Sequence, residues 1–381
     1  MISKKAQEIP PFIVMDVLEK AQELERRGER VIHMEVGEPD FDTPECVNEA
    51  GYRAICDGKT HYTHSLGLVE LREAIAEDYW KKYNVAVSPD RILIASGTSP
   101  ALLLVFSALL EPSDEVILPN PYYPCYPNII RYIDGSPVFV DVLEEEGFQY
   151  LPEMIEEKIG PRVKGIMINS PANPTGNVMG SERMAKIAGL SPFIISDEIY
   201  HGLVYEGKAH SILEFTDDAF VINGFSKLYA MTGWRLGYVI APAEFVRPMQ
   251  KLQQNLFISA SSFAQWGALA GLKNAEKDVQ RMRETYDQRR RFLIPRLREL
   301  GFGIKVEPTG AFYVLANAKH YSGDSYGFAF DILKEAKVGL APGIDFGSNA
   351  EGYLRVSYAN SLENIKEGTD RLEKYLERYK R

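Results

Sequence analysis

The stretch Asn223-Gly224-Phe225-Ser226-Lys227-Leu228-Tyr229-Ala230-Met231-Thr232-Gly233-Trp234-Arg235-Leu236-Gly237 follows a short apolar run, Phe220-Val221-Ile222. Such a run predicts a strand that is buried on both faces of a sheet, and Asn-Gly marks its end. Lys227 therefore lies just past a strand end, with Arg235 close behind it. Burial and a neighbouring cation both lower the pKa of an amine, as a Schiff-base lysine requires. A single lysine does not establish such a site, so the residues at the other strand ends must show whether Lys227 belongs to one.

Strand and helix patterns alternate through the middle of the chain. Apolar runs predict strands at 91–95, 115–119, 165–169, 193–196, 220–222 and 237–241. Helical spacing fits 11–27, 68–83, 100–110, 124–133 and 181–189. The alternation predicts an α/β fold with a mostly parallel sheet and helices on both faces. A long charged helix from about 275 leads into a second α/β set that includes a strand at 303–306.

The composition excludes several classes of protein. The 381 residues carry a formal net charge of -10 and no basic stripe, which argues against nucleic acid or an anionic membrane as a partner. The three cysteines form no CxxC pair, and no N-terminal segment resembles a signal peptide, so we expect a cytoplasmic protein. His61 and His64 have metal-ligand spacing but no partnering Cys or carboxylate nearby, so no metal site is predicted.

Polar residues follow the predicted strands, where ligands bind in open α/β sheets. Ser96-Gly97-Thr98-Ser99-Pro100 follows the first strand and predicts a helix N-terminus that could bind phosphate. Tyr122 and Tyr123 follow the second strand, where an aromatic ring can stack on a flat ligand. Each motif also has an ordinary structural explanation, as a helix cap or a packed tyrosine.

Two further strand ends complete the set. Asn173 is held extended by the proline behind it, and Asp197 and Tyr200 follow the strand at 193–196. A carboxylate placed after a buried strand needs a cationic or N–H partner. One sheet edge would then combine a phosphate site with an aromatic ring, an amide, a carboxylate, a phenol, an amine and a guanidinium. Together these groups favour pyridoxal phosphate, a flat phosphorylated aldehyde, over a separate ordinary explanation for each motif.

With these residues the chain resembles the class I/II aminotransferases of the fold-type I pyridoxal-phosphate superfamily over essentially its whole length. The matching stretches include Gly37-Glu38-Pro39-Asp40-Phe41-Asp42-Thr43-Pro44, Ser170-Pro171-Ala172-Asn173-Pro174-Thr175-Gly176 and, most specifically, Ala230-Met231-Thr232-Gly233-Trp234-Arg235-Leu236-Gly237. The resemblance implies a large domain, residues 45–280, with a mostly parallel seven-stranded sheet between helices. A smaller α/β domain would combine residues 1–44 and 281–381. The implied activity is that of a ping-pong transaminase.

The resemblance also implies a role for each matching residue. Lys227 binds the aldehyde of the cofactor pyridoxal phosphate and moves the substrate proton, while Asp197 pairs with the ring nitrogen. Tyr200 and Asn173 hydrogen-bond the ring oxygen, and Tyr123 stacks on the ring. The phosphate contacts are assigned to Gly97, Thr98, Ser99, Ser226 and Arg235.

Substrate and partner-subunit roles are implied in the same way. Arg355, an arginine within an apolar strand, would bind the substrate α-carboxylate with help from Asn173 and the backbone of Gly37. Tyr62 resembles a tyrosine that reaches the cofactor phosphate of a neighbouring subunit, which implies a homodimer with shared active sites. Gly224, where many relatives carry serine, and Pro100, in place of a commoner polar residue, depart from the family pattern at the phosphate site.

Two alternatives to transamination stay open. A C–S β-lyase on the same fold would use Lys227, Asp197 and Arg355 equally. A regulator that binds the cofactor without catalysis is less favoured, because the chain shows no helix-turn-helix segment or basic extension. The expected substrates are an amino acid and a 2-oxo acid, with 2-oxoglutarate as the acceptor. No Lys or Arg occurs from residue 92 to 130, which favours a donor with a neutral, apolar or aromatic side chain.

Overall fold

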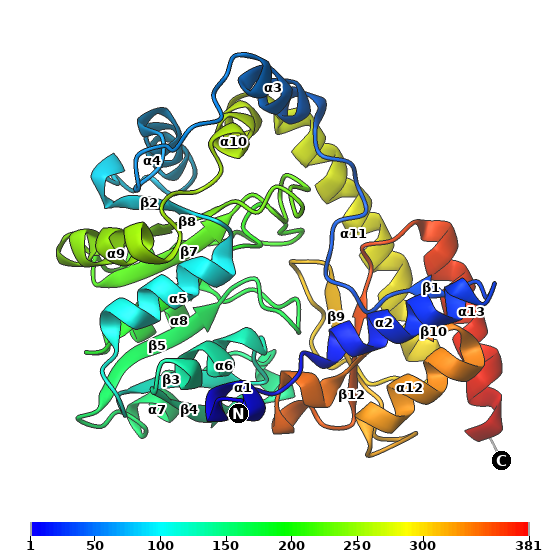
Figure 1. Ribbon diagram of the computed structural model, residues 1–381. Helices are drawn as coiled ribbons and strands as arrows, with labels where there is room; N and C mark the ends of the chain where they lie inside the picture. Colours follow the sequence, from blue (N-terminus) through cyan, green and yellow to red (C-terminus); the bar gives the residue numbers. More distant parts are fainter. Residues whose placement is uncertain (1, 380–381) are drawn as a thin grey trace.

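The computed structural model describes residues 2–379 and contains a large seven-stranded sheet, at left in Figure 1, beside a smaller group of strands and helices. In spatial order the large sheet consists of β2 (Ile92–Ala95), β8 (Gly237–Ile240), β7 (Ala219–Gly224), β6 (Phe193–Asp197), β5 (Val163–Asn169), β3 (Glu115–Asn120) and β4 (Ser136–Asp141). β8 runs antiparallel to both of its neighbours, and the other ladders are parallel. The predicted mostly parallel sheet is therefore confirmed.

These strands are apolar along their length because both faces of the sheet are covered. Successive side chains of a strand point to opposite faces, so Ile92 and Ile94 enter one core while Leu93 and Ala95 enter the other. Helices that contribute to the first core include α4 (Val69–Tyr83), α8 (Ser181–Ala188) and α10 (Ser262–Asn274). Helices that contribute to the second are α5 (Thr98–Leu109), α6 (Cys125–Tyr132) and α9 (Ala243–Leu256).

The smaller part joins the two ends of the chain. β11 (Ala341–Pro342), β12 (Tyr353–Ser357) and β9 (Tyr313–Asn317) form an antiparallel sheet, and β1 (Ile32–His33) pairs in parallel with β10 (Val338–Gly339). Its helices are α2 (Ile13–Arg26), α11 (Glu276–Glu299), α12 (Ser325–Ala336) and α13 (Leu362–Leu376). α2 lies beside α12 (Figure 1), so the N-terminal segment packs on the C-terminal part. The residue bounds of the two domains stay a prediction.

The sequence analysis missed several elements and misplaced one. α1 (Lys4–Glu8), α3 (Glu45–Cys56), α7 (Pro152–Glu156), α9, α10 and the half-buried edge strand β4 were not among the predicted ranges. The strand expected at 303–306 is wrong, since Gly303 makes only an isolated bridge to Asn317. Side chains, rather than a neighbouring strand, form the backbone hydrogen bonds of the next two residues. Arg298 donates to the carbonyl of Ile304, and the N–H of Lys305 donates to the side chain of Glu144. No helix in the described part of the chain has both the length and the apolar character needed to cross a membrane.

Candidate active site

A cavity of about 220 Å³ opens where the carboxyl ends of β5, β6 and β7 meet the smaller part of the molecule. Strand ends carry these groups because parallel strands all finish at the same edge of the sheet. Eight of the residues predicted from the sequence line the cavity: Gly37, Thr98, Tyr123, Asn173, Asp197, Tyr200, Lys227 and Arg355.

Lys227 lies partly buried in the wall of this cavity, and its Nζ donates a hydrogen bond of 2.5 Å to the carbonyl oxygen of Gly37. Desolvation is the main cause that lowers the pKa of Lys227 to about 8. Glu38 opposes that shift, while Arg355 and Arg235 add to it. An amine with this pKa is available in its neutral form near neutral pH, where it can act as a nucleophile or a base.

Asp197 ends β6 and is 4% exposed. Burial raises the pKa of its carboxyl to about 6, against two hydrogen bonds that favour the ionised form. The hydroxyl of Tyr126 donates to Oδ2 at 2.6 Å, and the N–H of Ile199 donates to Oδ1 at 3.1 Å. Tyr126 was not predicted, and its position three residues after Tyr123 on the same strand-to-helix turn is the signal that could have found it. Within residues 2–379 no cation forms an ion pair with Asp197, so its carboxylate is free to hold a positively charged ligand group.

Arg355 is a buried guanidinium at the opposite wall, 2% exposed on β12. Its Nη1 donates to Oδ1 of Asn173 at 2.9 Å, and its Nη2 donates to the main-chain oxygen of Glu35. The rings of Tyr313 and Phe346 lie 4.4 and 4.8 Å from its guanidinium carbon. Its Nε has no hydrogen-bond partner, and no carboxylate pairs with it, within the described ranges. A buried cation held only by neutral groups is suited to bind an anion from the cavity.

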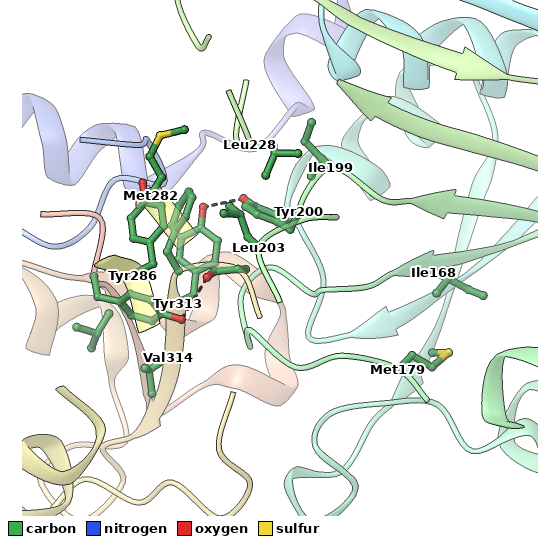
Figure 2. Close-up of a cluster of buried hydrophobic side chains, with 14 of the residues drawn as sticks. Ile168, Met179, Ile199, Tyr200, Leu203, Leu228, Met282, Tyr286, Tyr313 and Val314 are labelled. Carbon is green, nitrogen blue, oxygen red and sulfur yellow. Dashed lines mark hydrogen bonds between the residues drawn. The ribbon is translucent and has the colours of Figure 1, made fainter. Parts of the chain in front are cut away.

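A pair of phenols joins the two parts of the molecule at this cavity. The hydroxyls of Tyr200, after β6, and Tyr313, on β9, lie 2.8 Å apart (Figure 2). A Cβ at position 37 would lie 2.0 Å from the Tyr313 hydroxyl, so glycine there leaves room for this phenol. Sequence reasoning missed Tyr313, because an aromatic residue within an apolar strand has the pattern of a core side chain.

The group predicted to hold phosphate lies at the start of α5. Gly97 has φ +108°, and a Cβ there would lie 2.7 Å from Nη2 of Arg235, so the missing side chain leaves space beside a guanidinium. Thr98 begins α5 and lines the cavity, whereas Ser99, Ser226 and Arg235 lie outside its lining. A helix N-terminus next to an arginine is a donor set that suits a phosphate. With the amine of Lys227 and the carboxylate of Asp197, the residues present fit pyridoxal phosphate.

Tyr62, another of the predicted residues, lies on the surface of the molecule. It is 82% exposed, in the segment between α3 and α4, and it does not line the cavity of its own chain.

The chain was compared with known proteins. The model of the family described as aminotransferase class I and II matches residues 29–372. A (5-formylfuran-3-yl)methyl phosphate transaminase of Methanocaldococcus jannaschii is 46% identical over 99% of this chain and 100% of its own length. An aspartate/prephenate aminotransferase of Thermus thermophilus is 39% identical over 99% of both chains. The crystal structure of an aspartate aminotransferase from Thermus thermophilus with maleate has a TM-score of 0.94 at 39% identity, covering 98% of this chain and 99% of that one.

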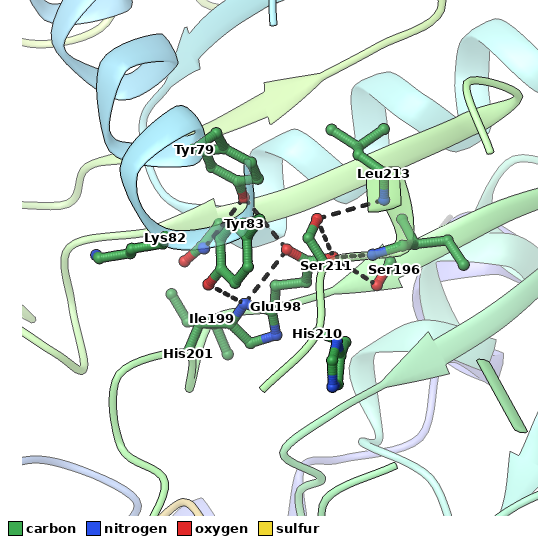
Figure 3. Close-up of polar contacts among 12 residues, drawn as sticks. Tyr79, Lys82, Tyr83, Ser196, Glu198, Ile199, His201, His210, Ser211 and Leu213 are labelled. Carbon is green, nitrogen blue, oxygen red and sulfur yellow. Dashed lines mark hydrogen bonds and ion pairs between the residues drawn. The ribbon is translucent and has the colours of Figure 1, made fainter. Parts of the chain in front are cut away.

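A second buried carboxylate, Glu198, follows Asp197 in the chain, and Figure 3 shows its polar contacts. Glu198 is 1% exposed, and its Oε1 accepts hydrogen bonds from the hydroxyls of Ser196 and Ser211 and from the N–H of Ile212, at 3.0–3.1 Å. Its Oε2 accepts from the hydroxyl of Tyr79 at 3.2 Å. Burial nevertheless raises the pKa of Glu198 to about 7. The network ties α4 and the segment after residue 210 to the end of β6.

The raised pKa of Glu198 predicts a pH-dependent stability. As pH rises from 4.5 towards 7 the unfolded chain loses this proton first, so folding becomes less favourable by up to roughly 3 kcal/mol. Glu198→Gln keeps an acceptor oxygen but cannot ionise. We expect its stability relative to wild type to increase over that pH range, measured by urea unfolding at a series of pH values. Glu182, whose side chain is 87% exposed, provides the control, and Glu182→Gln should show the same pH dependence of stability as wild type. Parallel curves for Glu198→Gln and wild type would contradict the assignment.

Proposed function

We propose a mechanism from the premise that the chain belongs to the aminotransferase class I and II family. The protein is an aminotransferase of fold type I, which moves an α-amino group from an amino acid to a 2-oxo acid. We propose that pyridoxal phosphate binds at Lys227 and that 2-oxoglutarate is the acceptor. The observation that supports this most directly is the partly buried amine of Lys227, with a pKa of about 8, in a cavity that also contains Asp197 and Arg355.

The proton transfers are assigned to residues whose pKa values suit them. When bound, pyridoxal phosphate supplies an aldehyde that captures the amino group and a ring that accepts electrons from the substrate Cα. The neutral Nζ of Lys227 would move the proton between Cα of the substrate and C4' of the cofactor, in one direction in the first half of the ping-pong cycle and in the reverse direction in the second half. Asp197, with two donors on its oxygens and no cation partner within residues 2–379, keeps the ring nitrogen protonated.

Other residues bind and orient. Arg355 binds the substrate α-carboxylate through its fork of N–H donors, and Asn173 and Gly37 complete that subsite. Tyr200 and Asn173 hold the ring oxygen, and Tyr123 packs on the ring face. The phosphate is held by Gly97, Thr98, Ser99, Ser226 and Arg235. The β-lyase considered from the sequence gains no support, because the relatives described above are named transaminases.

Removal of the Lys227 amine tests this assignment. We expect Lys227→Ala to lose the covalent attachment of pyridoxal phosphate, detected by mass spectrometry after borohydride reduction, and to lose turnover by about 10²–10⁴-fold or more, since both nucleophile and base are gone. Lys374→Ala, on the exposed side of α13, is the matched control and should keep both properties. Wild-type turnover in Lys227→Ala would exclude the mechanism.

The lining of the cavity supports a proposal for the donor. Phe12, Val14 and Met15, before and at the start of α2, line the cavity together with Tyr123, and the Phe12 and Tyr123 rings pack edge to face with their centroids 5.9 Å apart. Apart from Lys227 and Arg355, no Lys or Arg lines the cavity in the described part of the chain. A second carboxylate on the substrate would thus have no cation from its own subunit. We propose a donor with an apolar or aromatic side chain.

Competing amino acids test the proposed donor class. We expect kcat/KM for phenylalanine or tyrosine to exceed that for aspartate by about tenfold or more, because an unpaired buried carboxylate loses at least one charge-assisted hydrogen bond. The measurement is release of the 2-oxo acid from each amino acid supplied separately with 2-oxoglutarate. A preference for aspartate would contradict the proposal and point to a cation from a second subunit.

We propose that the active unit is a homodimer. Tyr62 is 82% exposed, and Ile258 and Phe263 are 48% and 38% exposed. The segments that carry them are hydrogen-bonded to each other, since Ser262 donates to the carbonyl of Lys59 at 2.7 Å and Gln265 to Thr63 at 3.1 Å. An exposed patch of this kind next to a predicted intersubunit tyrosine supports a dimer face there.

A charge placed in this patch tests the dimer. Sedimentation equilibrium of wild type should give about twice the chain mass of 42.9 kDa. Phe263→Glu should shift the species towards the single-chain mass, because a charge would be buried without a partner. Val306→Glu, at a 41% exposed site outside the patch, is the control and should leave the mass unchanged. A single-chain mass for wild type would exclude the dimer.

A further inference from the structure

The two cations of the cavity are held by main-chain carbonyls of one short segment. Nη2 of Arg355 donates to the carbonyl of Glu35, and Nζ of Lys227 donates to the carbonyl of Gly37 at 2.5 Å. Only Val36 separates these two acceptors along the chain. The place of both cations therefore depends on the path of residues 35–37, which lies beyond the end of β1.

An ion pair lies directly behind this segment. The carboxylate of Glu35 is fully buried, and its Oε1 lies 2.6 Å from Nδ1 of His33. Its Oε2 has no hydrogen-bond partner within residues 2–379. A Cβ at position 339 would lie 2.1 Å from Oε2, so Gly339 leaves the space that this carboxylate occupies. Glu35 is not part of the cavity lining, so it acts on the site only through its own backbone.

The surrounding structure fixes the chain just before the segment, at residues 33 and 34. The N–H of Met34 donates to the carbonyl of Gly339 at 3.1 Å, and the N–H of Ser357 donates to the carbonyl of Met34 at 2.8 Å. Asn360 donates to the carbonyl of His33 at 2.8 Å. After Met34 the pairing with β10 has ended, and the side chain of Glu35 is the next anchor.

We propose that the His33–Glu35 ion pair positions Arg355 through the main-chain carbonyl of residue 35, and thereby sets the affinity for the substrate carboxylate. The inference rests on the proposed role of Arg355 in binding that carboxylate. His33 and Glu35 are positioning residues, because neither lines the cavity. Displacements of about 1 Å in a binding group can change rates or affinities by about 10²-fold, so a small shift of residue 35 would be measurable.

The ion pair predicts the pH range over which His33 stabilises the segment. The hydrogen bond to Glu35 is the main cause that raises the pKa of His33 to about 9, with burial opposing it and Glu25 adding to it. The charged groups facing the ring are Glu35, on the same segment, and Glu25 of α2, whose Oε1 lies 3.2 Å from Nε2. A raised folded-state pKa means that the stabilisation is fully present below the ordinary value of 6.5 and is lost as pH rises through about 9.

Truncation of the pair separates positioning from simple structural support. In Glu35→Ala we expect KM for the amino acid donor to rise about tenfold or more while kcat changes less than about twofold, the sign of lost binding in ground and transition states alike. His33→Ala should give the same split and serves if Glu35→Ala does not fold. In wild type, KM should rise as pH passes about 9, and both variants should lack this rise.

Glu25→Ala is the matched control, because it removes the other, 44% exposed carboxylate partner of His33 and should leave KM within about twofold of wild type. The absorbance of bound cofactor, read for every protein, should not change. An active wild type whose KM is unchanged in the truncated variants would overturn this inference alone, and an apparent kcat that falls only in proportion to the amount of folded protein would then identify a purely structural role. A wild type that turns over no amino acid would overturn the proposed function, and this inference with it.

Discussion

The site depends on charged side chains that are withdrawn from water and held by neutral groups. Lys227 is held by a carbonyl, Arg355 by a carbonyl and an amide, and Asp197 by a phenol and a backbone N–H. A buried charge that is held only by neutral groups can still bind a ligand group of opposite charge, because no counter-charge of the protein has neutralised it. Such a site requires a scaffold in which different segments of the chain supply the hydrogen-bond acceptors and donors. The contact between the large sheet and the smaller part of the molecule brings these segments together.

The sheet explains why those segments converge. Parallel strands end at one edge, and β5, β6 and β7 deliver Asn173, Asp197 and Lys227 there. Arg355 comes from the separate antiparallel sheet, on β12. Its hydrogen bond to Asn173 and the contact between the phenols of Tyr200 and Tyr313 close the cavity across the boundary. The smaller part therefore contributes the guanidinium of the cavity, and the large sheet contributes its carboxylate and its amine.

What the sequence could predict follows from the same geometry. Residues directly after apolar runs could be assigned to one edge, because strand ends are visible in a local pattern. The contacts of Tyr126 with Asp197 and of Tyr313 with Tyr200 could not be predicted in this way, since the partners are 71 and 113 residues apart in the chain. The carbonyl of Glu35 and the guanidinium of Arg355 are 320 residues apart. Residues 303–306 show the reverse error, where a local strand pattern is overruled by side chains that take its backbone hydrogen bonds.

Asp197 and Glu198 show that burial alone does not decide which carboxylate can act on a ligand. They are neighbours, and their side chains point to opposite faces of the sheet end, where Asp197 meets Tyr126 and Glu198 meets Tyr79. Burial raises the pKa of both. Glu198, however, accepts from four donors, which occupy about as many lone-pair sites as a carboxylate has. Asp197 accepts from two on its side chain and borders the cavity, so it alone retains acceptor capacity that faces a ligand.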